Sequence, residues 1–163
     1  KQWISILSTS GLILLLEPYL ANASRRIIKA PKLYFMDTGL CAYLCGWPNA
    51  EMLEKSAMAE AFFETFVVTE IIKNYQAANL DYANTLFYYR DIDQKEIALL
   101  YVKERTITPI EIQKGMNPVK PNKNFSVLEK YQMPINTGFI IDTTDRIWPI
   151  NEKVYAIPVG LID

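Results

Sequence analysis

Three glutamates, Glu64, Glu96 and Glu111, have the spacing that carboxylate chemistry would need. Glu96 and Glu111 lie in the β-rich stretch Phe87 to Lys114, FYYRDIDQKEIALLYVKERTITPIEIQK. Carboxylates from neighbouring strands are common ligands of Mg²⁺, which prefers oxygen. This stretch is therefore the first place to look for a site.

Strand periodicity predicts how these side chains are arranged. Alternation places Glu96, Ala98 and Leu100 on one face of their strand. It places Glu111 and Gln113 together on one face of the next strand. Two carboxylates can then converge, whereas the alanine and the glutamine at these positions add no charge.

The third carboxylate, Glu64, falls in the longest helical pattern, Ser56 to Asn79. On a helical wheel Glu64 shares the sector of Val67, Val68 and Ile71, so we expect it at a partly buried surface. The helix is predicted to be a central core helix, because apolar residues form a broad face: Ala59, Phe62, Phe63, Phe66, Val67 and Ile71.

The other segments predict an α/β domain with an N-terminal appendage. We divide the chain into residues 1–55 and an α/β core of residues 56–163. In the first part we expect a helix from Trp3 to Ser10, a strand from Leu12 to Pro18, a strand from Lys32 to Phe35, and a helix from Gly39 to about Leu44 with Asp37 or Thr38 as N-cap. The first helix and strand resemble the end of a winged-helix unit.

The core is predicted to be rich in strands. Thr85–Arg90 and Glu96–Val102 should form a hairpin. We expect further strands at Thr106–Gln113 and Gly138–Ile141, a short helix at Phe125–Tyr131, and edge strands within Arg146–Leu161.

Composition excludes several classes of function. The 163 residues include 17 basic and 18 acidic side chains and no histidine, so bulk charge gives no argument for nucleic acid. The chain contains neither GxxxxGK[ST] nor GxGxxG, so this piece has no phosphate-cradling loop. Without histidine or a GxSxG turn, serine-type catalysis lacks its usual base.

The cysteines and the apolar runs predict a cytoplasmic protein with no membrane association. Cys41 and Cys45 lack the histidine companions of a zinc site, so we expect buried thiols in a reducing cytosol. The run Leu12 to Leu16 is far too short to cross a bilayer. The chain starts at Lys1 with a helix already under way, and we expect it to be a piece of a longer polypeptide.

Basic residues give a limited prediction of nucleic-acid contact. Arg25, Arg26 and Lys29 form the densest basic cluster, which could meet phosphate or remain a solvated loop. Lys114 is a further candidate for contact with nucleic acid.

Four ordered motifs resemble the family known as domain of unknown function 4143, found after AAA+ ATPase modules in bacteria and archaea. They are RIIKAPKLYFMDTGL from Arg26, AFFETFVVTEIIK from Ala61, YYRDIDQKEIAL from Tyr88, and PIEIQK from Pro109. The order of elements resembles the PD-(D/E)XK nuclease fold. The resemblance implies a restriction-endonuclease-like core with a mixed sheet flanked by helices, and Mg²⁺ bound by strand-end carboxylates.

The chain departs from this pattern at two positions. Ala98 stands where the resemblance implies an aspartate, and Gln113 stands where it implies a lysine. Glu64 and Glu111 are retained, and Glu96 lies about 7 Å from the lost carboxylate by strand rise. Lys114 faces the other side of its strand and is a poor substitute. The five positions therefore indicate a vestigial site: Glu64, Glu96, Ala98, Glu111 and Gln113.

The first hypothesis is a non-catalytic accessory domain for DNA or protein recognition, with ATP bound by an upstream AAA+ module. This fragment itself would then need no cofactor. A second is an Mg²⁺-dependent DNA endonuclease that uses Glu64, Glu96 and Glu111. A third is a domain through which ATPase subunits form a homo-oligomer.

Overall fold

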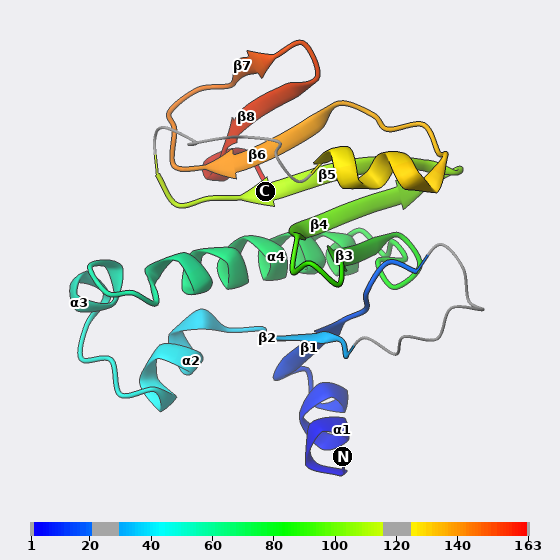
Figure 1. Ribbon diagram of the computed structural model, residues 1–163. Helices are drawn as coiled ribbons and strands as arrows, with labels where there is room; N and C mark the ends of the chain where they lie inside the picture. The colour runs from blue at the N-terminus through cyan, green and yellow to red at the C-terminus, as the bar shows by residue number, and fades with distance from the viewer. Residues whose placement is uncertain (1, 21–29, 116–124, 163) are drawn as a thin grey trace.

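The computed structural model describes residues 2–20, 30–115 and 125–162. Within these ranges a six-stranded sheet is flanked by helices, and a separate pair of strands lies beside the longest helix (Figure 1). The predicted α/β class, with a mixed sheet between helices, is confirmed. In the described ranges, no helix has the length and apolar character needed to span a bilayer.

The N-terminal part begins with α1 (Gln2–Thr9), β1 (Ile13–Leu16) and β2 (Lys32–Phe35). β1 and β2 are antiparallel, with Leu16 opposite Lys32. Helix α2 (Thr38–Leu44) follows, and the Asp37 carboxylate accepts a hydrogen bond from the Leu40 backbone N–H at 2.8 Å. Asp37 is thus the N-cap, as predicted.

A short helix, α3 (Ala50–Glu54), was not expected from the sequence. Asn49 caps it by accepting a hydrogen bond from the Met52 N–H at 2.9 Å. Five residues are too few to show an apolar period, and this explains why sequence periodicity missed the helix.

Helix α4 (Ala59–Ala77) is the predicted long helix, but its buried face differs from the expected one. Its buried residues are Val67, Val68, Thr69 and Ile72, whereas Phe66 is 41% exposed. Phe62 and Phe66 line a groove shared with α2, whereas Phe63 packs against the core cluster. The aromatic residues in the first half of the helix are therefore divided between the groove and the core.

The sheet contains β3 (Leu86–Arg90), β4 (Glu96–Lys103), β5 (Thr106–Ile112), β6 (Gly138–Asp142), β7 (Trp148–Asn151) and β8 (Val154–Pro158). Its spatial order is β3-β4-β5-β6-β8-β7. β5, β6 and β8 are parallel, and the other neighbours are antiparallel. We expected edge strands within Arg146–Leu161. That is right for β7 but wrong for β8, because β8 inserts between β6 and β7.

Two clusters of buried side chains cover the two faces of the sheet. On one face Val67, Val68 and Ile72 of α4 pack with residues of β3, β4, β5 and β6, and Leu14, Leu16 and Tyr34 of the β1–β2 pair join them. The described part of residues 1–55 thus shares a core with the long helix. On the other face the 3₁₀ helix η1 (Phe125–Tyr131) contributes Phe125 and Leu128. A second 3₁₀ helix, η2 (Val159–Leu161), follows β8.

An irregularity in β4 changes the predicted alternation. Phe87 pairs with Leu100 and Tyr89 with Ile97, so β4 has one more residue than β3 in this interval. Such a bulge reverses the facing of the residues beyond it. Ala98 and Leu99 both pack on the α4 side, while Leu100 belongs to the cluster on the opposite face. The expectation that Leu100 shares a face with Ala98 is therefore wrong.

Candidate functional site

A lysine joins two of the predicted carboxylates. Lys32 Nζ donates a hydrogen bond to Glu64 Oε1 at 2.7 Å and another to Glu96 Oε1. The three side chains are only 19%, 26% and 28% exposed, respectively. They come from β2, α4 and β4. The structure thus brings Glu64 and Glu96 together, as the sequence suggested, around a cation that sequence reasoning did not select.

Two further side chains complete this cluster, called here the Lys32 network and consisting of Lys32, Tyr34, Glu64, Arg90 and Glu96. Arg90 Nε donates to Glu96 Oε2 at 2.6 Å. The Tyr34 hydroxyl donates to Glu64 Oε1 at 2.7 Å. Within the network, two positive charges face two negative charges.

The protein environment favours the charged forms of Lys32 and Glu96. Burial lowers the pKa of Lys32, but hydrogen bonds and charge attraction from Glu64 and Glu96 outweigh this effect, and the pKa is raised overall. Burial raises the pKa of Glu96, but Lys32 and Arg90 outweigh that effect and lower it. Burial and the neighbouring Glu64 raise the pKa of Tyr34, so its hydroxyl stays protonated and can donate.

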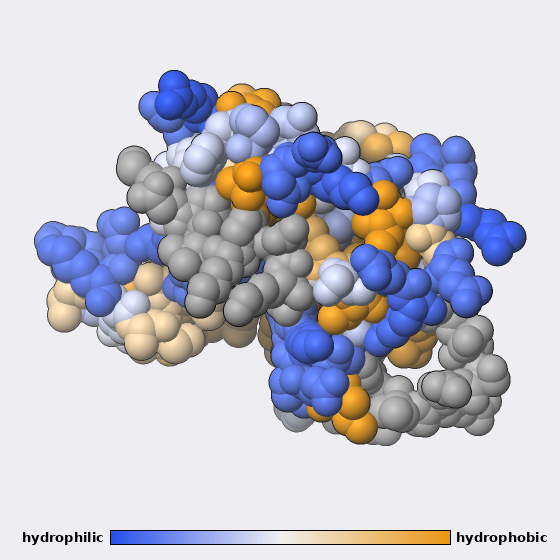
Figure 2. Space-filling view, turned by 45° about the horizontal axis from the view of Figure 1, so that its top comes forward, coloured by the Kyte–Doolittle hydropathy of each residue, from blue (hydrophilic) through white to orange (hydrophobic). Residues whose placement is uncertain are grey.

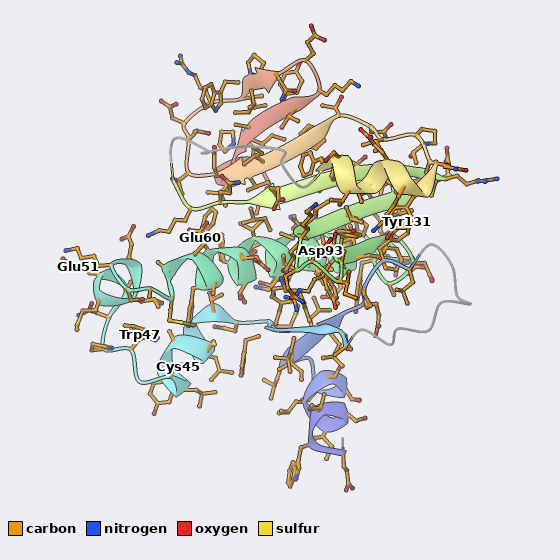
Figure 3. All side chains as sticks on the ribbon, viewed as in Figure 1. Cys45, Trp47, Glu51, Glu60, Asp93 and Tyr131 are labelled. Atoms are coloured by element: carbon orange, nitrogen blue, oxygen red, sulfur yellow. The ribbon has the colours of Figure 1, made fainter. Side chains whose placement is uncertain are left out.

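Local structure explains how these side chains meet. Lys32 and Tyr34 are two residues apart on β2, so both point to the same side. Arg90 and Glu96 are cross-strand partners beside the turn of the β3–β4 hairpin, an arrangement that favours opposite charges. Asp93 lies in the exposed turn that joins these strands (Figure 3). Glu64 precedes the buried valines of α4 by one turn, so its carboxylate reaches the margin of the core.

The third predicted carboxylate lies elsewhere. Glu111 pairs with Ile140, which belongs to the cluster beneath η1. Its neighbours Ile110 and Ile112 pack on the α4 side. Because successive residues of a strand alternate, Glu111 lies on the opposite face of the sheet from Glu64 and Glu96. The predicted convergence of Glu96 with Glu111 is therefore not found, and the endonuclease hypothesis loses one of its three carboxylates.

The two positions that departed from the nuclease pattern add no ligand to the network. Ala98 is 5% exposed and packs among apolar residues on the α4 side. Gln113 follows the end of β5, where its backbone N–H donates to the Ile141 carbonyl at 3.0 Å.

The residues present do not fit a resident Mg²⁺ ion. In the parts of the chain that the structure describes, no three histidine, cysteine or acidic side chains gather as metal ligands. The oxygens of Glu64 and Glu96 that converge already bond to the Lys32 ammonium. A dication at that point would have to displace or repel Lys32.

The predicted nucleic-acid residues are only partly placed. Arg25, Arg26 and Lys29 lie in residues 21–29, outside the described ranges. Lys114 contacts the end of α3 and the start of α4. Its ammonium donates a hydrogen bond to the Glu54 carbonyl at 3.1 Å, and its backbone N–H donates to the Glu60 carboxylate at 3.0 Å. Lys114 therefore links the end of β5 to α3 and α4.

The cysteines are free thiols, as expected, but they are not buried. Cys41 is half-buried and Cys45 is exposed. Helix α2 has no buried residue, so the expectation of buried thiols is wrong. Figure 3 shows Cys45, Trp47 and Glu51 at one end of the molecule, where α2 and α3 lie.

Sequence reasoning missed Lys32, Tyr34 and Arg90. A usable signal was present, because all three lie inside the motifs that were already singled out: Lys32 and Tyr34 in APKLYF, and Arg90 in YYRD. Lys32 and Tyr34 lie two residues apart and so share one face of a short strand. Because partly buried polar groups need hydrogen-bond partners, this pattern predicts a polar neighbour for both side chains.

Fold and site together define a mixed α/β domain with a partly buried ion network. A family model described as Domain of unknown function (DUF4143) matches residues 59–162, and another described as Domain of unknown function (DUF8612) matches residues 1–51. Since the first match covers more than half of the chain, the protein belongs to the DUF4143 family, as its motifs predicted.

Two curated relatives are similar over nearly the whole chain. They are the uncharacterized proteins Mb2031c of Mycobacterium bovis and Rv2008c of Mycobacterium tuberculosis, each 25% identical over 162 residues, or 99% of this chain. The chain spans 35% of the length of each relative. No solved structure matches the chain closely enough to count as a relative.

Proposed function

We propose that this chain is a non-catalytic accessory domain that serves DNA or protein recognition within a longer AAA+ ATPase. One observation carries the proposal: the retained carboxylates Glu64 and Glu96 are bonded to Lys32 instead of being open to a catalytic metal ion. An active two-carboxylate nuclease site needs oxygens that can bind Mg²⁺ and hold it beside a phosphate.

Two further facts support a role without cleavage. Glu111 lies across the sheet from the other two carboxylates. Ala98 contributes a methyl group where the nuclease pattern would have a metal ligand. The site is thus a degenerate form of the PD-(D/E)XK arrangement that the sequence resembles.

The relatives support the larger context. Each is nearly three times as long as this chain, which spans 35% of its length. Room for an ATPase module is consistent with the AAA+ context that the motifs imply. ATP would bind in that module, since the present sequence has no phosphate-cradling loop.

A cleavage assay tests the main proposal. The purified protein is incubated with supercoiled and linear DNA in an excess of Mg²⁺ or Mn²⁺, the oxygen-preferring cations that a carboxylate site would bind. We expect no cleavage above that of a Glu64→Gln variant. Metal-dependent cleavage that is lost in Glu64→Gln would refute the proposal and establish the endonuclease alternative.

DNA recognition is tested separately, by salt-dependent binding. If this cluster contacts DNA phosphates, neutralising Arg25, Arg26 and Lys29 together should abolish binding. Neutralising them one at a time should make the dependence of the binding constant on salt concentration shallower. Lys114→Ala serves as the comparison, because its charge is engaged with α3. Binding that does not change in the triple variant would argue against the cluster as the contact.

A second candidate function is self-assembly of the ATPase through the region of α2, α3 and α4. A groove of about 440 Å³ lies there, and Tyr43, Trp47, Leu53, Phe62 and Phe66 are among its lining residues. Tyr43 is 79% exposed and Leu44 is 63% exposed. On the face shown in Figure 2, hydrophobic patches interrupt the hydrophilic surface, one of them at the end where α2 and α3 lie. Exposed apolar surface of this kind favours contact with another protein.

Light scattering after size-exclusion chromatography tests that second candidate. If a second copy covers the groove, the protein should be oligomeric, and Tyr43→Lys should shift it toward monomer. Ile92→Lys is a matched control, because Ile92 is 83% exposed but lies in the β3–β4 turn, away from the groove. An oligomer that both variants leave intact, or a monomeric parent protein, would exclude this surface as the contact.

A further inference from the structure

We propose that the Lys32 ammonium occupies the position in which Glu64 and Glu96 would otherwise hold a divalent cation, and that removing Lys32 converts this carboxylate pair into a divalent-cation site. The proposal concerns the cation chemistry of the site. It does not depend on whether the domain binds DNA or a protein partner.

Geometry is the first support. Glu64 Oε1 and Glu96 Oε1 come from a helix and a strand that are distant in sequence, yet both bond to the same nitrogen atom. The two oxygens therefore converge on one point, which a cation already fills. Mg²⁺ sites in proteins commonly use one or two carboxylates and complete the octahedron with water. A pair of converging carboxylates is thus a sufficient set of protein ligands.

Charge is the second support. Within the Lys32 network, the two positive charges of Lys32 and Arg90 equal the two negative charges of Glu64 and Glu96, so a dication would add two positive charges to a neutral group. Without Lys32, the network carries one net negative charge, and a divalent cation becomes favourable. Arg90 still bonds to the second oxygen of Glu96, so the new site should be weak.

The origin of Lys32 is the third support. Both carboxylates lie in the segment that matches the DUF4143 model, residues 59–162, whereas Lys32 lies in the segment that matches the other family model, residues 1–51. Strand β2 places the lysine against α4 because Tyr34 is 4% exposed within the core shared with α4. The lysine therefore comes from a strand outside the segment that carries both carboxylates.

The test is a Mn²⁺ titration of Lys32→Met, in which methionine keeps the length of the side chain but removes its charge. Electron paramagnetic resonance reports free Mn²⁺ directly. We expect Lys32→Met to bind about one equivalent at least tenfold more tightly than the unsubstituted protein, in the weak range of about 0.1–1 mM. Mg²⁺ should compete, and the added Glu64→Gln substitution should abolish the gain.

Lys73→Met is the matched control. Lys73 also pairs with a glutamate, Glu70 at 2.7 Å, but among the described residues no second carboxylate bonds to it. This variant should gain no Mn²⁺ binding. A folded Lys32→Met variant that binds Mn²⁺ no better than Lys73→Met would overturn the proposal.

A measurement on the unsubstituted protein keeps the proposal testable if Lys32→Met does not fold. Mn²⁺ broadens the NMR signals of nuclei close to it. With Lys32 in place, we expect no broadening centred on Glu64 and Glu96 at Mn²⁺ concentrations well below about 0.1 mM, the tight end of the range expected for Lys32→Met. Selective broadening there would show that the lysine does not fill the cation position, and the inference would fail.

Discussion

Replacing Lys32 by alanine should destabilise the protein considerably, because it leaves two carboxylates facing each other at a partly buried position. Hydrogen bonds to charged groups contribute about 1.5–3 kcal/mol each, and breaking a fully buried ion pair costs about 3–5 kcal/mol. Lys32, Glu64 and Glu96 retain 19–28% exposure, so water screens part of this loss. We therefore expect Lys32→Ala to lower the free energy of unfolding by about 2–3 kcal/mol.

Urea denaturation measures the change, and thermal unfolding provides a second reading. A loss of that size corresponds to a fall of about 4–12 °C in the melting temperature of a domain of this length. The control is Lys55→Ala, which removes an exposed pair with Glu51 at 2.6 Å, where both side chains are more than 70% exposed. That variant should lose less than about 1 kcal/mol.

A double-mutant cycle isolates the interaction itself. Lys32→Ala combined with Glu64→Ala should be more stable than the sum of the single changes predicts, by at least about 1 kcal/mol, since the two side chains are in contact. The reasoning is refuted if Lys32→Ala costs no more than Lys55→Ala, or if the cycle gives no coupling.

Three other outcomes follow from the structure. The pKa of Glu96 is below its ordinary value of 4.5 in the folded state, so its ion pairs stabilise the protein above about pH 4.5. This stabilisation is lost as the pH falls through the lower, folded-state pKa. Urea denaturation between pH 3 and 7 should therefore show a smaller decrease in stability at acid pH for Glu96→Gln than for the unsubstituted protein. Gly138→Ala should lower the free energy of unfolding by about 1–3 kcal/mol, because a Cβ there would lie 2.5 Å from the Phe125 ring. Gly160→Ala is the control: a Cβ there would have nothing within 4 Å, so its stability in thermal or urea unfolding should be nearly unchanged. Asp37→Ala should cost about 1 kcal/mol by removing the N-cap of α2, and Asp37→Asn should restore most of it; equal stability of the two variants would contradict the capping role.

The local elements were predictable wherever a segment was long enough to show a period or carried a capping residue. The β3–β4 hairpin, the η1 helix and the Asp37 cap agree with the sequence prediction. Helix α3 was missed because it is five residues long. Phe62 and Phe66 were expected on the apolar face of a core helix, but they line the groove shared with α2, because periodicity identifies an apolar face but not the element that covers it.

Of the candidate site, the sequence predicted the partly buried position of Glu64, and the endonuclease hypothesis grouped Glu64 with Glu96. It placed Glu111 with them, and here the prediction was wrong. The error has a physical cause: facing along a strand depends on register, and β4 contains a bulge that no local pattern announces. The relative facing of β4 and β5 residues was therefore decided by strand pairing.

What the sequence by itself determined was the α/β class, the family and most of the strands and helices, because these depend on side-chain periods and motifs within short segments. Only the tertiary structure decided which charges meet. Lys32 is separated from Glu64 by 32 residues and from Glu96 by 64 residues. Its position depends on the packing of Tyr34 and the β1–β2 pair against α4, a long-range arrangement that brings a lysine to the carboxylates.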